Sequence, residues 1–394
     1  MNSSKHSKQI LKCLDKNYST TRLCYKLLDD SYLDSRGRVR EDVKFRINIP
    51  ELDIRDSKIP KQGEEKFDTY LFLPEVEGRQ GEGGLRTRGY FKFSYEIENG
   101  RWYACSFRGK RLFEVEPPKE LDIDIDMLRA ENRIARLPLV SVITVVFNGD
   151  KYIEETIQSI IKQSYPNIEY IVIDGCSTDN TLEIIKRYED KIDYWISERD
   201  SGMYHALTKG FSLSNGNILS WLNSDDIYYP YTIETVVSTM LYYKIKWVTG
   251  VPSLIDEKGR MINVEHPKYY FRSLIKRGYY RGDILGYIQQ ESTFFTRGLL
   301  YKVGGINILL KLAADYDLWI KFAHYENLYT VKVILASFRK HQDQKSSNRA
   351  QYLKECSYVS PSPKLKLAKY ILKPLGILLS RKILRSPYLK RFLR

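Results

Sequence analysis

The stretch Asn217-Ile218-Leu219-Ser220-Trp221-Leu222-Asn223-Ser224-Asp225-Asp226 joins an apolar run to a cluster of polar side chains. The run at residues 218–222 is short, mostly apolar and preceded by a glycine, which predicts a buried strand. An amide and two carboxylates follow where that strand would end, and such oxygen ligands suit Mg²⁺ or Mn²⁺ carrying phosphate groups. A solvated turn that caps the next helix would use the same residue types. The neighbouring segments have to decide between these two interpretations.

Four apolar runs in the chain are each followed closely by a polar residue. The runs are residues 139–146, 168–173, 194–196 and 218–222, and the polar residues are Asn148, Asp174, Asp200 and Asp225. The polar residues lie about 26 residues apart, which is the period of a strand, a helix and two loops. The pattern predicts βαβ units and a mostly parallel sheet. Because ligands of such sheets bind at the carboxyl ends of the strands, we expect one polar crevice there.

Length and composition limit the classes of protein that fit. The 394 residues are enough for two domains, and the hydrophobic share of 43% is typical of a globular chain. The five cysteines are an odd number without a C-x-x-C pair, which argues against disulfides and structural zinc and for a reducing cytosol. The five histidines lack the spacing of metal-dependent peptidases. We find no signal peptide and no apolar run long enough to span a membrane.

The positive charge is concentrated at the C-terminal end of the chain. Of the net +14, residues 351–394 carry 11 Lys and Arg against one acidic residue. From residue 365 these basic residues alternate with Leu and Ile, as in segments that bind anionic membrane surfaces. An ordinary helix packed on the body is the alternative, since two prolines and a glycine interrupt the segment. No basic and aromatic module accompanies this tail, so we do not expect nucleic acid as a partner.

The N-terminal third differs from the βαβ region. Glycines at residues 78–84 predict a loop, and alternating apolar residues from 90 to 97 predict a strand. Asn99-Gly100 then predicts a type I′ hairpin turn within an antiparallel β meander at about 90–116. This meander is either a structural addition or a surface that contacts carbohydrate, and residues 120–136 follow it as a linker or a bridging helix. We therefore divide the chain into an extension (1–137), a main domain (138–350) and a tail (351–394).

Five ordered segments of the main domain carry a resemblance to a known family. They are residues 141–148 (SVITVVFN), 173–181 (IDGCSTDNT), 200–206 (DSGMYHA), 222–226 (LNSDD) and 314–319 (ADYDLW). Together they resemble the family 2 glycosyltransferases of bacterial polysaccharide biosynthesis, which have the GT-A fold. The resemblance implies an α/β, Rossmann-like domain with a mostly parallel sheet and flanking helices. It covers about residues 139–346 and does not extend to the extension or the tail.

The resemblance implies a binding site for a nucleotide-sugar at the strand ends. In the first segments, Thr144, Phe147 and Asn148 would line the nucleotide, and Asp174 would hydrogen-bond the base or its ribose. Further donor contacts implied in the same way are Ser177, Asp200, Gly202, Lys209, Asn223 and Ser224.

The resemblance also implies a divalent cation, Mn²⁺ or Mg²⁺, and a catalytic base. Residues 223–225 correspond to the family's metal-binding D-x-D element, with Asp225 as the metal ligand and Asp226 beside it. Asn at the first position departs from that element, so phosphate oxygens would supply further ligands. His341 falls where related folds place a late metal or diphosphate contact, although a solvated loop histidine is equally compatible. Asp315 matches the family's catalytic base, with Asp317 as the second candidate and a helix N-cap as the structural alternative for Asp315.

These features predict an inverting, metal-dependent glycosyltransferase of surface polysaccharide biosynthesis. The donor would be a nucleotide-diphosphate sugar, for which we expect a UDP-sugar, and the acceptor a hydroxyl of a glycan or a lipid-linked saccharide. We expect the enzyme in the cytoplasm, peripheral at the inner membrane face through its tail. The alternatives are a non-catalytic protein that binds nucleotide-sugars or carbohydrate, and a nucleotide-sugar pyrophosphorylase. A pyrophosphorylase would need a Gly-rich phosphate loop after the first strand, and the sequence after residue 146 does not supply one.

Overall fold

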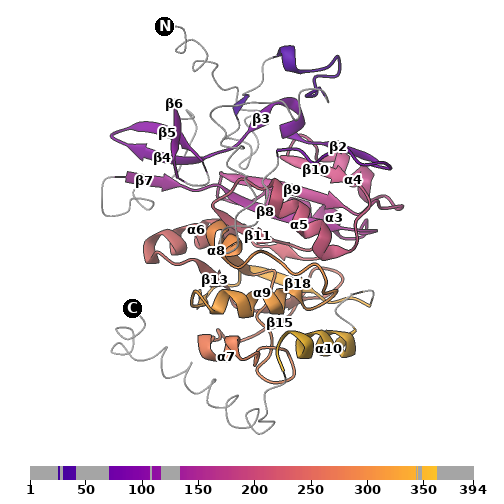
Figure 1. The fold of residues 1–394 in the computed structure, drawn as a ribbon, viewed down its shortest axis with the longest axis vertical. Helices are drawn as coiled ribbons and strands as arrows, with labels where there is room; N and C mark the ends of the chain where they lie inside the picture. The colour runs from indigo at the N-terminus through magenta and orange to yellow at the C-terminus, as the bar shows by residue number, and fades with distance from the viewer. Residues whose placement is uncertain are drawn as a thin grey trace.

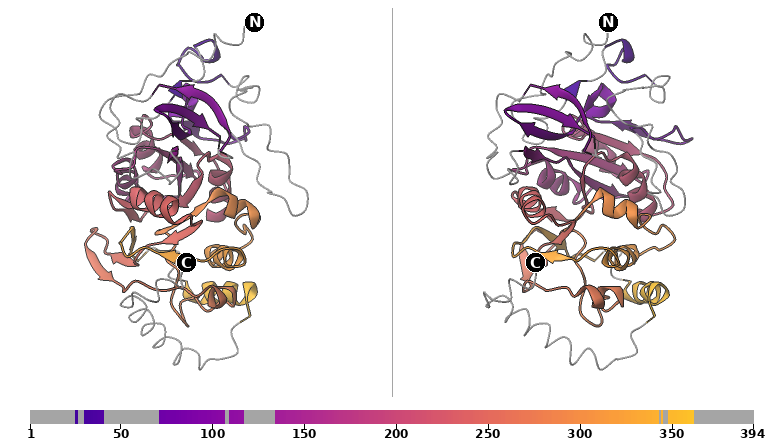
Figure 2. Two further views of the ribbon diagram at one scale, coloured as in Figure 1. Left: turned by 90° about the vertical axis from the view of Figure 1, so that its left-hand side faces the viewer. Right: turned by 60° about the vertical axis from the view of Figure 1, so that its left-hand side comes forward.

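The computed structural model describes residues 25–26, 30–40, 71–106, 109–116, 134–342, 344 and 348–361. Most of the predicted linker and the basic amphipathic part of the tail lie outside these residues. Along the longest axis, the N-terminal strands lie at one end and helices α7 and α10 at the other (Figures 1 and 2). The large central sheet lies between these ends.

The central sheet has eight strands and is built around four parallel ones. In spatial order the strands are β17 (Tyr329–Thr330), β13 (Trp247–Thr249), β16 (Thr293–Thr296), β11 (Ile218–Trp221), β8 (Val140–Val146), β9 (Ile168–Asp174), β10 (Tyr194–Ser197) and β2 (Gly81–Gly83). Strands β11, β8, β9 and β10 run parallel, whereas β16 and β2 are antiparallel to their neighbours. The four strands and the parallel sheet predicted from the apolar runs are confirmed.

Helices connect the parallel strands and cover the sheet (Figure 1). They are α3 (Ile153–Ile161), α4 (Thr181–Arg187) and α5 (Met203–Leu213). Every residue of β8 and β9 is buried, as expected for strands covered on both faces. Helix α5 approaches β8 so closely that a Cβ atom on Gly210 would lie 2.4 Å from Cγ2 of Ile143. Glycine at this position permits the contact between helix and strand.

The predicted meander is present as a second, four-stranded antiparallel sheet. Its order is β6 (Arg111–Val115), β5 (Arg101–Cys105), β4 (Ser94–Glu98) and β7 (Ile134–Leu137). Asn99 and Gly100 have φ angles of 51° and 78°, as a type I′ turn requires, so the hairpin prediction is confirmed. The end of the predicted linker is instead strand β7, which pairs with β4.

The prediction of a loop at residues 78–84 is wrong for residues 81–83. These residues form strand β2, which pairs antiparallel with β10 at the edge of the central sheet. The glycines here serve close packing, because a Cβ atom on Gly83 would lie 2.5 Å from Nε1 of Trp195. Two buried ion pairs also join this part of the chain to the main sheet. Arg86 Nη2 lies 2.7 Å from Glu169 Oε1, and Lys92 Nζ lies 2.8 Å from Asp193 Oδ2. The division into three domains stays a prediction.

A third, smaller sheet and several helices complete the molecule. The sheet order is β12 (Ile227–Tyr228), β18 (Ala336–Arg339), β14 (Ser253–Ile255) and β15 (Met261–Val264). The remaining α-helices among the described residues are α6 (Thr232–Tyr243), α7 (Arg272–Lys276), α8 (Arg297–Lys302), α9 (Ala314–Ala323) and α10 (Arg349–Val359). Trp319 of α9 stacks on Trp221 and Trp247, with ring centroids 5.7 and 5.6 Å apart, and so anchors α9 to the central sheet. No helix in the described part of the chain combines the length and apolar character needed to cross a membrane.

Candidate active site

The loops that follow β8 and β9 are joined by hydrogen bonds through Asn148. Its side-chain oxygen accepts a hydrogen bond from the Thr178 N–H at 2.8 Å, and its own N–H donates to Ser177 Oγ at 2.8 Å. Asn148 has a φ angle of 51°, in the left-handed region that asparagine tolerates better than most residues. This turn leaves the neighbouring Phe147 ring 57% exposed. An exposed aromatic ring at a strand end is suited to stacking on a flat ligand.

Gly175 brings the loop after β10 to the same place. A Cβ atom on Gly175 would lie 2.8 Å from Asp200 Oδ2 and 3.4 Å from Cδ2 of Phe147. Asp200 Oδ1 accepts the N–H of Gly202 at 2.6 Å, and Gly202 has a φ angle of 118°. Phe147, Asp200 and Gly202, all expected at the donor site, therefore lie at one edge of the sheet.

Three other residues expected to contact the donor are engaged within the protein. Thr144 is fully buried, and its Oγ1 accepts a hydrogen bond from Tyr170 at 3.1 Å. Asp174 is also fully buried and accepts hydrogen bonds from the backbone and hydroxyl of Ser177 and from Ser197 Oγ. Lys209 Nζ lies 2.6 Å from Glu198 Oε1. These contacts hold the strand ends in place behind the crevice surface.

The turn after β11 is held by Arg339 of β18. The Arg339 side chain donates to the Asp225 carbonyl at 2.7 Å, and its backbone N–H donates to Asp226 Oδ1 at 2.8 Å. Asp226 is fully buried, and burial together with the charges of Asp225 and Glu291 raises its pKa well above the usual value. These contacts support a role for Asp226 in shaping the turn.

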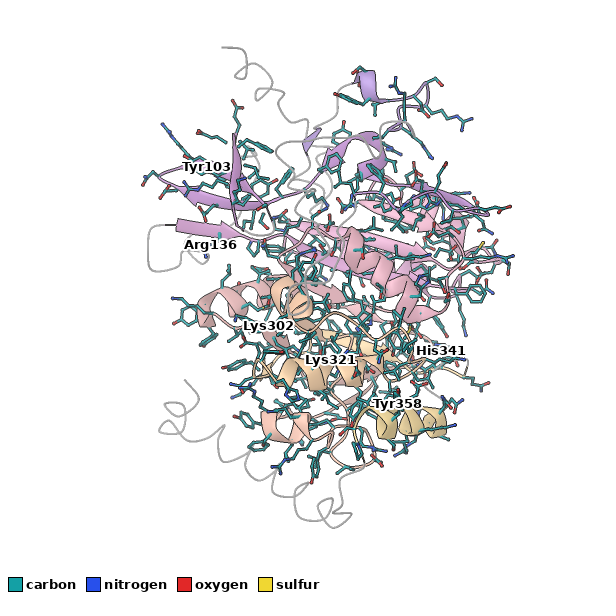
Figure 3. All side chains as sticks on the ribbon, in the orientation of Figure 1. Tyr103, Arg136, Lys302, Lys321, His341 and Tyr358 are labelled. Atoms are coloured by element: carbon teal, nitrogen blue, oxygen red, sulfur yellow. The ribbon has the colours of Figure 1, made fainter. Side chains whose placement is uncertain are left out.

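Asp225 and His341 form the polar pair of this turn. His341 Nε2 lies 2.9 Å from Asp225 Oδ2, and His341 packs on the Tyr152 ring with centroids 5.0 Å apart. Figure 3 labels His341 on the right-hand side of the molecule, above Tyr358 of α10 (Arg349–Val359). Among the described residues, no group of three or more His, Cys, Asp or Glu side chains is arranged to hold a metal ion. A cation bound to Asp225 and His341 would need its remaining ligands from phosphate and water, which is how Mg²⁺ is commonly held.

Asn223 and Ser224 lie in the turn after β11. Asn223 donates through Nδ2 to Gln290 Oε1 at 3.3 Å, while its buried Oδ1 has no hydrogen-bond partner among the described residues. Ser224 Oγ would lie 3.2 Å from a Cβ atom on Gly149, so the β11 turn also meets the loop after β8. The turn and the strand-end loops thus form a continuous surface.

Asp315 lies in the first turn of α9, and its buried Oδ1 has no hydrogen-bond partner within the described part of the chain. Burial raises the pKa of this carboxyl to about 6, and the nearby charge of Glu355 adds to the effect. The N-cap residue of α9 is Ala313, which makes no side-chain capping bond. The alternative prediction that Asp315 is the N-cap of this helix is therefore wrong. Asp317 differs, because its Oδ2 lies 2.6 Å from Nζ of Lys321, which Figure 3 labels on α9.

Glu291 is a candidate that our sequence analysis did not select. It is buried, its Oε1 has no hydrogen-bond partner among the residues that the structure describes, and its pKa is raised to about 8 by burial and by the charges of Asp225 and Asp315. The charges of both Asp225 and Asp315 therefore act on Glu291. Its position in the polar segment Gln289-Gln290-Glu291, just before an apolar strand, was the signal in the sequence.

Comparisons with known proteins identify the class. The profile described as Glycosyl transferase family 2 matches residues 141–301. An uncharacterized glycosyltransferase of Rickettsia typhi is 34% identical over 221 residues, which cover 55% of this chain and 69% of that protein. The chain belongs to glycosyltransferase family 2, and its α/β structure with a large, mainly parallel sheet is the GT-A fold predicted from the sequence.

Other relatives match shorter parts of their own length. The match covers 37% of a longer uncharacterized glycosyltransferase of Rickettsia felis, at 34% identity and over 56% of this chain. The putative teichuronic acid biosynthesis glycosyltransferase TuaG of Bacillus subtilis is 40% identical over 108 residues, covering 26% of this chain and 42% of that protein.

Solved structures with a similar arrangement include two nucleotide-sugar complexes. The structure of S. aureus TarS 1–349 with UDP-GlcNAc has a TM-score of 0.46 and 18% identity, covering 63% of this chain and 73% of that one. The mannosyltransferase PcManGT of Pyrobaculum calidifontis with GDP-Man and Mn²⁺ has a TM-score of 0.45 and 19% identity, covering 65% and 72%.

Proposed function

We propose that this protein is an inverting glycosyltransferase that transfers a sugar from a nucleotide-diphosphate donor to an acceptor hydroxyl. The observation that carries this proposal is Asp315, a carboxyl with a pKa of about 6 and a buried oxygen that has no partner in the described ranges of the chain. A general base works best when its pKa lies near the working pH, and an ordinary surface aspartate is too weak a base. Asp315 is thus suited to take the proton of the attacking hydroxyl.

The strand-end loops would hold the donor. Phe147 is exposed for stacking on the nucleotide base, and Asp200 and Gly202 lie beside it. Asp225 and His341 would hold Mg²⁺ or Mn²⁺, which when bound neutralises the charge that develops on the departing diphosphate. Asn223 Oδ1, which is buried and unpartnered, is available to a donor hydroxyl or to a water of that cation.

In the proposed reaction, the acceptor hydroxyl attacks the anomeric carbon from the side opposite the nucleotide. The new bond to the acceptor oxygen forms while the bond to the diphosphate oxygen breaks, so the configuration at the anomeric carbon inverts. Asp315 receives the hydroxyl proton, and the nucleoside diphosphate leaves with the electron pair. Glu291, with a pKa of about 8, would be protonated at neutral pH and able to donate a hydrogen bond to a sugar oxygen.

The class of acceptor and the location of the enzyme are also proposals. Similarity to TuaG over 108 residues supports a role in surface polysaccharide synthesis. The acceptor would be a glycan or a lipid-linked saccharide, and a UDP-sugar remains the expected donor. The excess of basic residues in the tail supports attachment to an anionic membrane surface from the cytoplasmic side.

A donor panel with two matched variants tests the proposal. UDP-glucose, UDP-N-acetylglucosamine, UDP-galactose and GDP-mannose are each incubated with the protein and Mn²⁺, and release of the nucleoside diphosphate is followed with and without a mixture of acceptor glycans. We expect Asp315→Asn to lower transfer by roughly 10²–10⁴-fold while donor binding is kept. Asp317→Asn, two residues further along α9 and paired with Lys321, should stay near the wild-type rate. Full activity of Asp315→Asn with loss in Asp317→Asn would move the base to Asp317, and no turnover of any donor would favour a non-catalytic binding protein.

A further inference from the structure

Helix α10 lies outside the part of the chain that the family profile matches, yet it contacts the segment that carries Asp315. The profile ends at residue 301, and α10 spans Arg349–Val359. Glu355 of this helix is buried among the backbone amides that precede α9. Its Oε2 accepts hydrogen bonds from the N–H groups of Lys311, Leu312 and Ala313 at 3.1, 2.9 and 3.0 Å.

Three amides converging on one carboxylate oxygen fix the backbone of residues 311–313. These residues lead directly into α9, so their orientation decides where the first turn of the helix places Asp315. Oε1 of Glu355 accepts a further hydrogen bond from Gln351 Nε2 at 3.1 Å, which holds the carboxylate on α10. Burial alone would raise the pKa of Glu355, but the hydrogen bonds from Leu312, Gln351, Ala313 and Lys311 keep it below its usual value. Glu355 is therefore ionised over the working pH range.

Helix α10 is itself anchored to the body of the protein. Arg281 Nη2 donates to the Leu353 carbonyl at 3.3 Å and to Ser357 Oγ at 3.1 Å. Tyr352 packs edge-on against Tyr287 with ring centroids 5.6 Å apart. Cys356 is buried against Ala313 and Tyr316. These contacts give Glu355 a fixed base from which to hold the α9 entry.

We propose that Glu355 is a positioning residue of the active site, which orders the 311–313 segment from which the first turn of α9 places Asp315. This inference rests on the proposed role of Asp315 as the general base. Like charges close together disfavour ionisation, so the ionised Glu355 raises the proton affinity of Asp315. A base held this way is both correctly placed and stronger.

Other titratable groups also face Asp315 and must be kept constant in a test. They come from three elements besides α9: Tyr204 of α5, Tyr287 and Glu291 of the loop before β16, and Tyr352 and Cys356 of α10. All of these side chains are retained when Glu355 is substituted. The Glu355 charge also acts on Tyr204, but burial raises the pKa of Tyr204 well above its usual value, so Tyr204 stays protonated in the range where Asp315 titrates.

The first measurement needs no substrate. In the full-length protein labelled with ¹³C at the aspartate carboxyls, the Asp315 signal is assigned by its loss in Asp315→Asn and is then titrated. Glu355→Gln keeps an oxygen for the three amides but removes the charge, so the pKa of Asp315 should fall by roughly half a unit to one unit. Tyr358→Ala, a change at an exposed residue of the same helix (Figure 3), should leave the titration unchanged.

Hydrogen exchange and turnover complete the test. In Glu355→Ala, the amides of residues 311–313 should lose protection, and release of UDP from UDP-N-acetylglucosamine, or from whichever panel donor is turned over, should fall at least about tenfold. If Glu355→Ala fails to fold, Glu355→Gln carries the test through its titration and through its pH–rate profile, in which the loss of rate at acid pH should move to a lower pH than in the wild type. An unchanged Asp315 titration together with unchanged protection of the three amides would overturn the inference, even if Asp315→Asn is inactive. Full activity of Asp315→Asn would instead overturn the proposed base, and with it the role of Glu355 in catalysis.

Discussion

His341 Nε2 lies 2.9 Å from Asp225 Oδ2, although the two residues are 116 positions apart in the chain. Arg339, two residues before His341, holds the Asp225 carbonyl and so fixes the spacing of the pair. A carboxylate and an imidazole at this distance are able to share one proton or to bind one cation. The predictions below begin from this pair.

Nucleotide binding should depend on a cation held by the pair. We expect UDP affinity in Mn²⁺ to fall at least about tenfold in Asp225→Ala and in His341→Ala, because the diphosphate has no Gly-rich loop to replace the ion. Asn223→Asp should keep or strengthen binding by adding a carboxylate. Calorimetric titration of UDP with and without EDTA measures the effect, and Asp190→Ala, at an exposed aspartate, is the control. Equal wild-type affinity in the two buffers would contradict a metal-dependent site.

The rate of transfer should rise with pH through about 6 and then level off. Burial raises the pKa of Asp315 to about 6, and only the ionised carboxylate accepts the hydroxyl proton, so activity is lost as the pH falls through that value. The dependence of kcat on pH, measured from about pH 5 to 8 with a saturating donor, checks this. The residual rate of Asp315→Asn should not change with pH near 6. A change of the wild-type rate near pH 8 would instead indicate that Glu291 is the titrating group, since its pKa is raised to about 8.

Arg86→Met should destabilise the whole main sheet. Arg86 and Glu169 are both buried, and Arg86 also donates to the carbonyls of Leu71 and Leu213 at 2.8 and 3.0 Å. Loss of one partner leaves a buried charge uncompensated, which costs about 3–5 kcal/mol. Urea denaturation measures the change, and Arg88→Met is the matched control because its pair with Glu189 is partly exposed and worth about 1 kcal/mol or less. Equal effects of the two substitutions would show that burial of the Arg86 pair does not matter.

Two C-terminal truncations should separate membrane attachment from catalysis. Removal of residues 362–394 takes away ten Lys and Arg and no acidic residue, so the protein should no longer pellet with vesicles containing anionic lipid. Transfer should persist, because α10 ends at Val359. Removal of residues 349–394 should also abolish transfer, since Glu355 is lost. Sedimentation with vesicles and donor turnover measure the two effects, and vesicle binding by the shorter truncation would place the attachment elsewhere.

The parallel strands were predictable because their residues carry a continuous apolar pattern. Strands β8, β9, β10 and β11 each read as such a run, and the polar residue after each marks its end. Strand β2 was not predictable, because Gly81-Glu82-Gly83 has the composition of a turn and becomes a strand only by packing under Trp195. Its partner lies more than a hundred residues away, beyond what a local pattern reports.

The candidate site was predictable only in part, for a similar reason. The sequence motifs identified Asp225, His341 and Asp315 as candidates. They did not show which oxygen atoms of the site lack a hydrogen-bond partner among the described residues. Thr144 and Asp174 resemble donor contacts in sequence, yet their polar atoms are used by Tyr170, Ser177 and Ser197. Glu355 is the opposite case, because no sequence motif surrounds it. Its proposed positioning role comes from hydrogen bonds with three backbone amides about 43 residues earlier in the chain.

If Glu355 positions Asp315 as we propose, its late place in the chain also decides when transfer becomes possible during synthesis. A ribosome releases the chain from the N-terminus, and early segments fold first. The strands that precede Phe147, Asp200 and Asp225 leave well before Glu355, and Arg339 and His341, which complete the proposed cation site, also precede Glu355 in the chain. We therefore expect the nascent chain to be able to bind nucleotide before it can transfer sugar. Helix α10 would then be the element whose synthesis allows transfer to begin.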